Sequence, residues 1–178
     1  DPRVRGTRTG QLIASGSYWV PARVDLDTVL SKLDSQIVEQ VNVIKGPYSA
    51  QHGPGFNFID VELLHSPRSS QGPVSSGMTV LEYQHNGEQW YCRQQFEIDS
   101  NDYGLIGSYG HRTGSDYKIG GGDETIPSSY KSRDLYLAFG ADLSDTSSVE
   151  MNYLRLDQTG VELAGQALNI DVLTTDAF

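Results

Sequence analysis

Apolar and polar residues alternate with a period of two from about residue 73 onward. In the clearest run, one side carries Leu135, Leu137, Phe139, Ala141 and Leu143, and the other carries Tyr136, Ala138, Gly140 and Asp142. A period of two places successive side chains on opposite faces of a β-strand, whereas a helix needs a period near 3.6. The sequence therefore predicts antiparallel hairpins with one apolar face in this part of the chain.

Five strands are expected here, at residues 78–85, 89–98, 103–111, 135–143 and 149–153. The Asn86-Gly87 pair predicts a type I′ hairpin turn, because both residues tolerate a positive φ. Further turns are expected at residues 99–102 and 144–146, and a long loop at 112–131. No clear strand is expected from Gln158 to Phe178.

The same alternation assigns the side chains of the other strands to faces. One face carries Trp90, Cys92, Phe96 and Ile98 of the second strand, Tyr103, Leu105 and Tyr109 of the third, and Val149, Met151 and Tyr153 of the fifth. The first strand is ambiguous, since Leu81 and Tyr83 take one face while Met78 and Val80 share the other with Glu82 and Gln84.

Two architectures explain this alternation: a soluble β-sandwich with one wet face and a transmembrane β-barrel. The apolar faces of the last four expected strands have no Lys or Asp at their middle, where a cation would cost roughly 2–4 kcal/mol in lipid. Connection lengths also favour the barrel, because short turns gather at one end and long connections at the other. The short Asn86-Gly87 turn is the exception to that rule.

Composition excludes several classes of protein. The 178 residues suffice for one domain or two small ones, and a formal charge of -10 disfavours binding to nucleic acid. Cys92 is the sole cysteine, which excludes an intrachain disulfide and a cysteine-based metal site. It is expected to fill apolar space. No apolar run approaches the roughly 18 residues of a membrane helix, and the first residues contain no signal-peptide core.

Residues 1–68 combine helix and strand signals, and Ser66–Pro73 has the composition of a linker. Asp27 is expected to cap a helix at residues 28–33, and Asp34-Ser35 forms a second capping signal. A strand at 41–45, a glycine-rich bend at 48–55 and a return strand at 58–63 follow.

The segment Val41–Leu63, VNVIKGPYSAQHGPGFNFIDVEL, resembles the plug domain of TonB-dependent outer-membrane receptors. In that family a "VEVIKGP" stretch is followed by a glycine-containing bend and a return strand. Arg5-Gly6 is similar to the "RG" of the plug, and Leu26–Val43 to its short helix and following strand. The chain departs from the family at Phe58–Val61, which lacks the usual glycine, and at Tyr18-Trp19, which replaces a "DG" hairpin.

This resemblance implies a mainly β fold with a small α/β plug portion, and antiparallel hairpins from the start of a large transmembrane β-barrel that is incomplete in this chain. Residues 1–68 would be the later part of the plug, and 69–178 roughly the first five barrel strands. Such a barrel has about 22 strands, and open strand edges are not stable in hydrocarbon. We therefore expect the chain to be a piece of a longer receptor.

The implied function is energised uptake of a scarce ligand, such as an iron-siderophore, cobalamin or a glycan, across the outer membrane. The implied partners are a TonB-type energy-coupling complex of the inner membrane, the small ligand and membrane lipid, with no nucleic acid and no cofactor. No enzymatic activity is expected, because the sequence contains no recognisable nucleophile motif. The four histidines also lack metal-ligand spacing.

Four residues are candidates for specific roles under this resemblance. Arg5 and Lys45 would anchor the plug by pairing with carboxylates of the barrel wall; the alternative is an ordinary exposed cation. Tyr18 and Trp19 would contact ligand from an apical loop, or else pack against the wall. No catalytic residue and no metal ligand is expected.

A different class of protein is a soluble extracellular β-rich module that binds carbohydrate or another ligand. In that case Trp19 and Trp90 would be stacking platforms. A hydrolase would need a convergent pair of carboxyl groups, for which the sequence gives no signal.

Overall fold

The computed structural model divides the chain into two compact units, residues 1–65 and residues 66–178. The division lies three residues before the boundary expected from sequence. The structure describes residues 3–4, 7–8, 11–14, 17–18, 30, 32–52, 57–69, 72–125, 127–163 and 168–177. The identity of the two units as plug and barrel wall stays a prediction.

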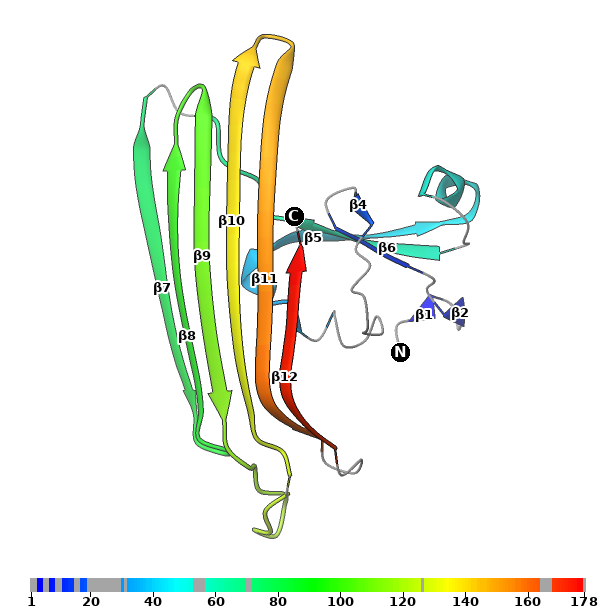
Figure 1. Ribbon diagram of the computed structural model, residues 1–178, viewed down its shortest axis with the longest axis vertical. Coiled ribbons are helices and arrows are strands. Elements are labelled where there is room, and N and C mark those ends of the chain that lie inside the picture. The colour runs from blue at the N-terminus through cyan, green and yellow to red at the C-terminus, as the bar shows by residue number, and fades with distance from the viewer. Residues whose placement is uncertain are drawn as a thin grey trace. The chain divides into compact units, whose positions relative to one another are not determined.

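The second unit is one six-stranded antiparallel sheet whose spatial order follows the chain (Figure 1). Its strands are β7 Val74–Gln84, β8 Gln89–Asp99, β9 Tyr103–Gly114, β10 Tyr130–Ser144, β11 Ser147–Leu163 and β12 Leu168–Ala177. The sheet is open, with β7 and β12 at its edges. The expected mainly β fold with antiparallel hairpins is confirmed.

The number of strands was underestimated from sequence. Five were expected and none after Gln158, but β11 continues to Leu163 and β12 pairs with it from Leu154↔Ala177 to Leu163↔Leu168. The missed strand reads LNIDVLTTDA. Its Thr-Thr-Asp ending breaks the apolar alternation, although threonine is itself a favourable strand residue because of its β-branched side chain.

The pairing register places the side chains in straight rows across the strands. One such row is Ser75–Ile98–Leu105–Phe139–Met151. This side of the sheet, termed the exposed face, carries uncovered Leu81, Tyr83, Trp90, Phe96, Tyr103, Tyr109, Leu137, Phe139, Val149 and Met151. The opposite side, termed the buried face, carries buried Arg93, Gln95, Ile106, Ser108, Asp134, Tyr136, Ala138, Leu154 and Leu156.

The face assignments made from sequence are confirmed for the last four of the five expected strands. The register also settles the ambiguous strand, because Leu81 pairs with Cys92 and Tyr83 with Trp90. Leu81 and Tyr83 therefore belong to the exposed face. Cys92 lies there too and is exposed.

The turn between β7 and β8 differs from the expected type I′ turn at Asn86-Gly87. The connection is the four residues between Gln84 and Gln89, and the positive φ angles are those of Gly87, 79°, and Glu88, 44°. Instead of forming that turn, Asn86 makes two side-chain hydrogen bonds to the backbone of Lys118 in the loop between β9 and β10. That distant contact could not be read from the local sequence.

The first unit contains a mixed four-stranded sheet of order β4-β3-β6-β5 and a separate two-stranded sheet. Its elements are β1 Arg3–Val4, β2 Thr7–Arg8, β3 Gln11–Ala14, β4 Ser17–Tyr18, η1 Ser35–Ile37, β5 Val38–Lys45, η2 Gly46–His52 and β6 Asn57–Leu63. The strands expected at 41–45 and 58–63 are confirmed as β5 and β6, which pair antiparallel. Buried Ile37, Phe58, Val61 and Leu63 form the described core.

Helical signals in this unit are confirmed in part. The Asp34 carboxylate accepts a bond of 2.9 Å from the Gln36 backbone N–H and caps η1, as expected. Of the helix expected at 28–33, Leu30 and Lys32 are helical and Leu33 is not, whereas Thr28, Val29 and Ser31 lie outside the described residues. Gly46 begins η2 with a φ of 66°, and Gly53–Gly55 lies outside the described part.

Candidate functional site on the two faces of the sheet

A buried ion pair joins β8 to β10 across the intervening strand β9. Arg93, Gly110 and Asp134 lie in one row of the register. The guanidinium of Arg93 donates to both carboxylate oxygens of Asp134, at 2.8 and 2.7 Å. Both bonds come from a single nitrogen, Nη2, and both are charge-assisted, which makes them stronger than bonds between neutral groups.

Gly110 makes the crossing possible because it has no side chain. A Cβ at this position would overlap the Asp134 carboxylate and the Arg93 guanidinium. The other two guanidinium nitrogens of Arg93 also donate, Nε to the Tyr91 hydroxyl at 2.8 Å and Nη1 to the Ser108 hydroxyl at 2.6 Å. Arg93 is 0% exposed, so the carboxylate and these hydroxyls replace the water that the charge has lost.

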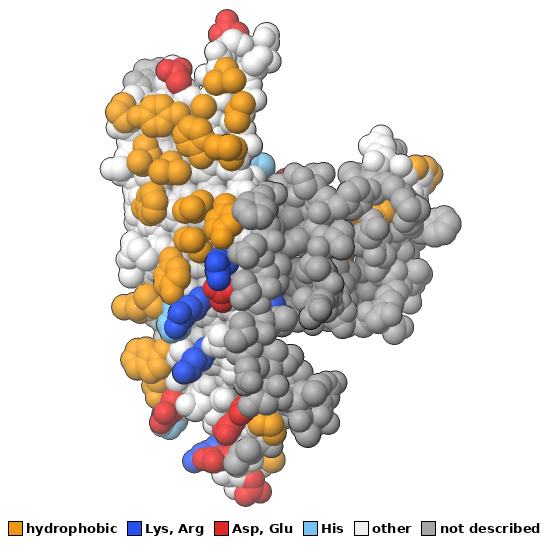
Figure 2. All heavy atoms as spheres, in the orientation of Figure 1, with side chains coloured by type: hydrophobic (Ala, Val, Ile, Leu, Met, Phe, Trp, Pro, Cys, Tyr) orange, Lys and Arg blue, Asp and Glu red, His pale blue; other side chains and the backbone are white. Residues whose placement is uncertain are grey.

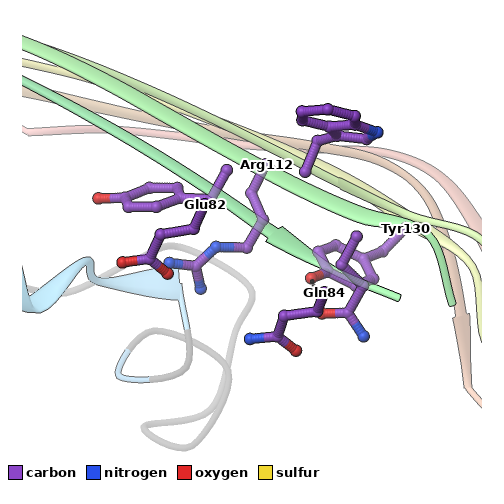
Figure 3. Close-up of a pocket in the computed structure, with 7 residues that line it drawn as sticks. Glu82, Gln84, Arg112 and Tyr130 are labelled. Atoms are coloured by element: carbon purple, nitrogen blue, oxygen red, sulfur yellow. Dashed lines mark hydrogen bonds between the residues drawn. The ribbon is translucent and has the colours of Figure 1, made fainter. Parts of the chain in front are cut away.

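Near the loop ends of β7–β10, a cavity of about 130 Å³ is lined by Glu82, Gln84, Gln89, Trp90, Tyr91, Arg112 and Tyr130 (Figure 3). Glu82, Tyr91 and Arg112 lie in one row. The Arg112 guanidinium lies 4.6 Å from the centre of the Tyr91 ring, within cation–π distance. The Tyr130 hydroxyl donates to the Gln89 amide oxygen at 3.2 Å.

The chemistry of this cavity suits a small polar ligand. Amide, hydroxyl and guanidinium groups supply donors, while amide and carboxylate oxygens supply acceptors. Tyr91 and Tyr130 add a smaller apolar surface to a lining that is mostly polar. Of these residues only Trp90 was a candidate from the sequence, as a stacking platform of a soluble module, because the lining comes from four strands and meets only through the register.

The loop between β9 and β10 is fixed beside this cavity. Asn86 donates to the Lys118 carbonyl at 2.9 Å and accepts from the Lys118 N–H at 2.7 Å. The Ser115 N–H donates to the Gly87 carbonyl at 2.7 Å, and Ser128 N–H to the Asp116 carboxylate at 2.7 Å. The Asn86 and Ser115 bonds attach the long loop to the β7–β8 hairpin, and the Ser128–Asp116 bond joins the two ends of the loop.

The exposed face is a candidate membrane surface. Figure 2 shows apolar side chains over the upper part of the sheet, and charged side chains lower on its right-hand strands. On β7 and β8 the apolar residues continue toward the opposite end through Leu81, Tyr83 and Trp90. The apolar band therefore crosses the rows of the register obliquely.

The angle at which the apolar band crosses the rows matches the strand tilt of a barrel wall. Strands about 4.8 Å apart and tilted by about 35–45° shift a horizontal plane by roughly 1.0–1.5 residues from one strand to the next, hence by about five residues over the four steps from β7 to β11. The row of Leu81 leads through Cys92, His111 and Arg133 to Asp157. Counting about five residues back along β11 from Asp157 reaches the apolar residues Met151 and Tyr153.

The residues predicted as sites from sequence are placed only in part. Lys45 ends β5 opposite Asn57, is exposed, and has no ion pair among the described residues. Tyr18 is a residue of β4, and its backbone pairs with that of Ile13 in β3. Arg5 and Trp19 lie outside the described residues. The anchoring and ligand-binding roles stay predictions.

Two general features of the described residues bear on function. None of their helices is long and apolar enough to cross a membrane. No group of three or more His, Cys, Asp or Glu residues among them is arranged to hold a metal ion.

No family model and no curated protein sequence matches the chain. A solved structure does: the ferric enterobactin receptor of Pseudomonas aeruginosa, a point variant in complex with enterobactin. The similarity covers 84% of this chain and 25% of the receptor chain, with a TM-score of 0.52 and 13% sequence identity. At this identity the likeness shows the fold alone, and the chain spans about a quarter of the receptor's length.

Proposed function

We propose that this chain is part of an outer-membrane receptor that takes up a scarce small ligand with energy from an inner-membrane TonB-type complex. The observation that carries the proposal is the oblique apolar band of the exposed face. A soluble sheet has no reason to displace its apolar residues strand by strand in proportion to a barrel tilt. The fold shared with part of a ferric enterobactin receptor supports the same class of protein.

In this function the two faces of the sheet have different tasks. The exposed face contacts lipid, and the buried face belongs to the lumen side with its ion pair and polar cavity. The cavity near Arg112 would contact ligand on its path, together with the loops beside it. Ligand binding and release would involve no covalent chemistry, so the protein is proposed not to be an enzyme.

Uptake by the intact protein in its natural host tests this proposal. Deletion of the gene should abolish energy-dependent uptake of one of three probes, namely iron-55 enterobactin, labelled cyanocobalamin or labelled maltodextrin. Restoring the gene should restore that uptake, and collapsing the proton-motive force should remove it again. Unchanged uptake of all three probes in the deletion strain would refute the transport function.

A further inference from the structure

The segment Ser66–Ser69 lies on the buried face, at the end of the sheet where the short turns are. It crosses Asp99, Gly104, Gly140 and Glu150, which form one row of the register. The sequence predicts a linker at Ser66–Pro73, but its first half is a docked piece of chain. It is termed the strap below.

The two glycines of this row form the floor on which the strap rests. A Cβ at Gly104 would overlap the backbone of Pro67, and a Cβ at Gly140 would overlap the side chains of Arg68 and Ser66. Every other amino acid carries at least that Cβ. The strap can therefore dock here only because both neighbouring strands have glycine in the same row.

Carboxylates hold the strap on both sides of this floor. The Ser69 N–H and hydroxyl each donate to Asp99 at 2.8 Å. On the other side Arg68 lies 3.3 Å from an Asp142 oxygen and 3.6 Å from a Glu150 oxygen. The side chain of Arg68 is 18% exposed, so its ion pairs are partly shielded from solvent.

Intrastrap bonding fixes the conformation that fits this floor. Arg68 Nη1 donates to the Ser66 hydroxyl at 2.7 Å, and the Ser66 N–H lies 3.4 Å from a Glu150 oxygen. Ser66 is 5% exposed. The strap therefore combines shape, through the two glycines, with charge, through Arg68.

We propose that the strap is a charge-latched leash that controls how far the first unit can move from the sheet. The two units meet between His65 and Ser66, so the docked strap fixes the chain to the sheet immediately after the first unit. Undocking frees the chain as far as Val74, where β7 begins. Eight residues span at most about 26–29 Å when extended. The latch thus switches the tether between almost no slack and a span of at most about 26–29 Å.

Hydrogen exchange on the full chain in detergent micelles tests the latch. Arg68→Gln removes both ion pairs, and Gly140→Ala fills the floor while leaving every charge in place. Both variants should raise exchange of the Ser66 and Ser69 amides at least tenfold. Arg155→Gln, which breaks the Arg155–Asp157 pair on the exposed face, and Gly120→Ala, where a Cβ meets nothing, should leave these amides unchanged.

Distances between the two units test the leash. Spin labels on the native thiol of Cys92 and on Glu39→Cys, an exposed position of β5, should give a distance distribution that broadens by 10 Å or more in Arg68→Gln, but not in Arg155→Gln. Equal exchange in Arg68→Gln and the parent chain would overturn the latch. Faster exchange with an unchanged distance distribution would overturn the leash. Neither outcome depends on ligand uptake.

Discussion

At the scale of single residues, the buried face depends on glycines whose importance the sequence does not reveal. Gly110 reads as an ordinary member of an alternating strand, and Arg93 and Asp134 are 41 positions apart. The alternation that puts Trp90, Cys92 and Phe96 on the apolar side of β8 leaves Arg93 on the other side, where the structure has it. The alternation could not identify the partner, because a pair that crosses a strand is defined by two registers at once.

Gly110→Ala is the sharpest test at this scale. The new methyl group would separate Arg93 from Asp134, and a broken buried pair costs about 3–5 kcal/mol because a charge remains without a partner. Urea unfolding of the intact protein in micelles should show that loss in the free energy of unfolding. Gly120→Ala should stay within about 0.5 kcal/mol of the parent. A loss below about 1 kcal/mol in Gly110→Ala would show that the pair adapts.

At the scale of elements, the positions and faces of most strands follow from the alternation alone. The apolar runs of β8 to β10 were strong enough to give the faces directly. The failures have physical causes: β12 ends in polar but β-branched residues, and Asn86 bonds to a loop 32 positions away instead of setting its own turn.

Asn86→Ala should release the loop between β9 and β10. Both bonds to the Lys118 backbone would be lost, and each is worth about 0.5–1.5 kcal/mol. Exchange of the Lys118 amide should rise by about tenfold or more, with little change in the strands. Asn101→Ala, in the turn between β8 and β9, is the matched control. Equal protection of Lys118 in both variants would mean that other bonds hold the loop.

At the scale of the whole molecule, the sequence predicted the order of the two units but not all of their elements. The strand, bend and return strand at 41–63 predicted the second half of the first unit, and the hairpins predicted the second unit. The strap was read as a linker, because its fit depends on Gly104 and Gly140, which are far away in sequence. The cavity residues were likewise separated by up to 48 positions between Glu82 and Tyr130.

Phe139→Arg distinguishes a lipid-facing sheet from a soluble one. Phe139 lies within the apolar band and is 37% exposed, so an arginine there should cost roughly 2–4 kcal/mol in a bilayer. The amount of protease-resistant protein in the outer membrane should fall accordingly. Leu143→Arg, next to the short turn and 68% exposed, should have little effect. If both variants behave like the parent, the exposed face contacts water, and the alternative of a soluble ligand-binding module is favoured.

The row that joins Arg93, Gly110 and Asp134 also has a consequence for how the sheet assembles. A slip of one residue between β9 and β10 would turn Asp134 to the opposite face and strand the Arg93 charge. A slip of two residues would keep the face but move the carboxylate about 7 Å along the strand. Because only the native alignment joins the two charges, the pair favours the native register of β9 and β10 over misaligned ones.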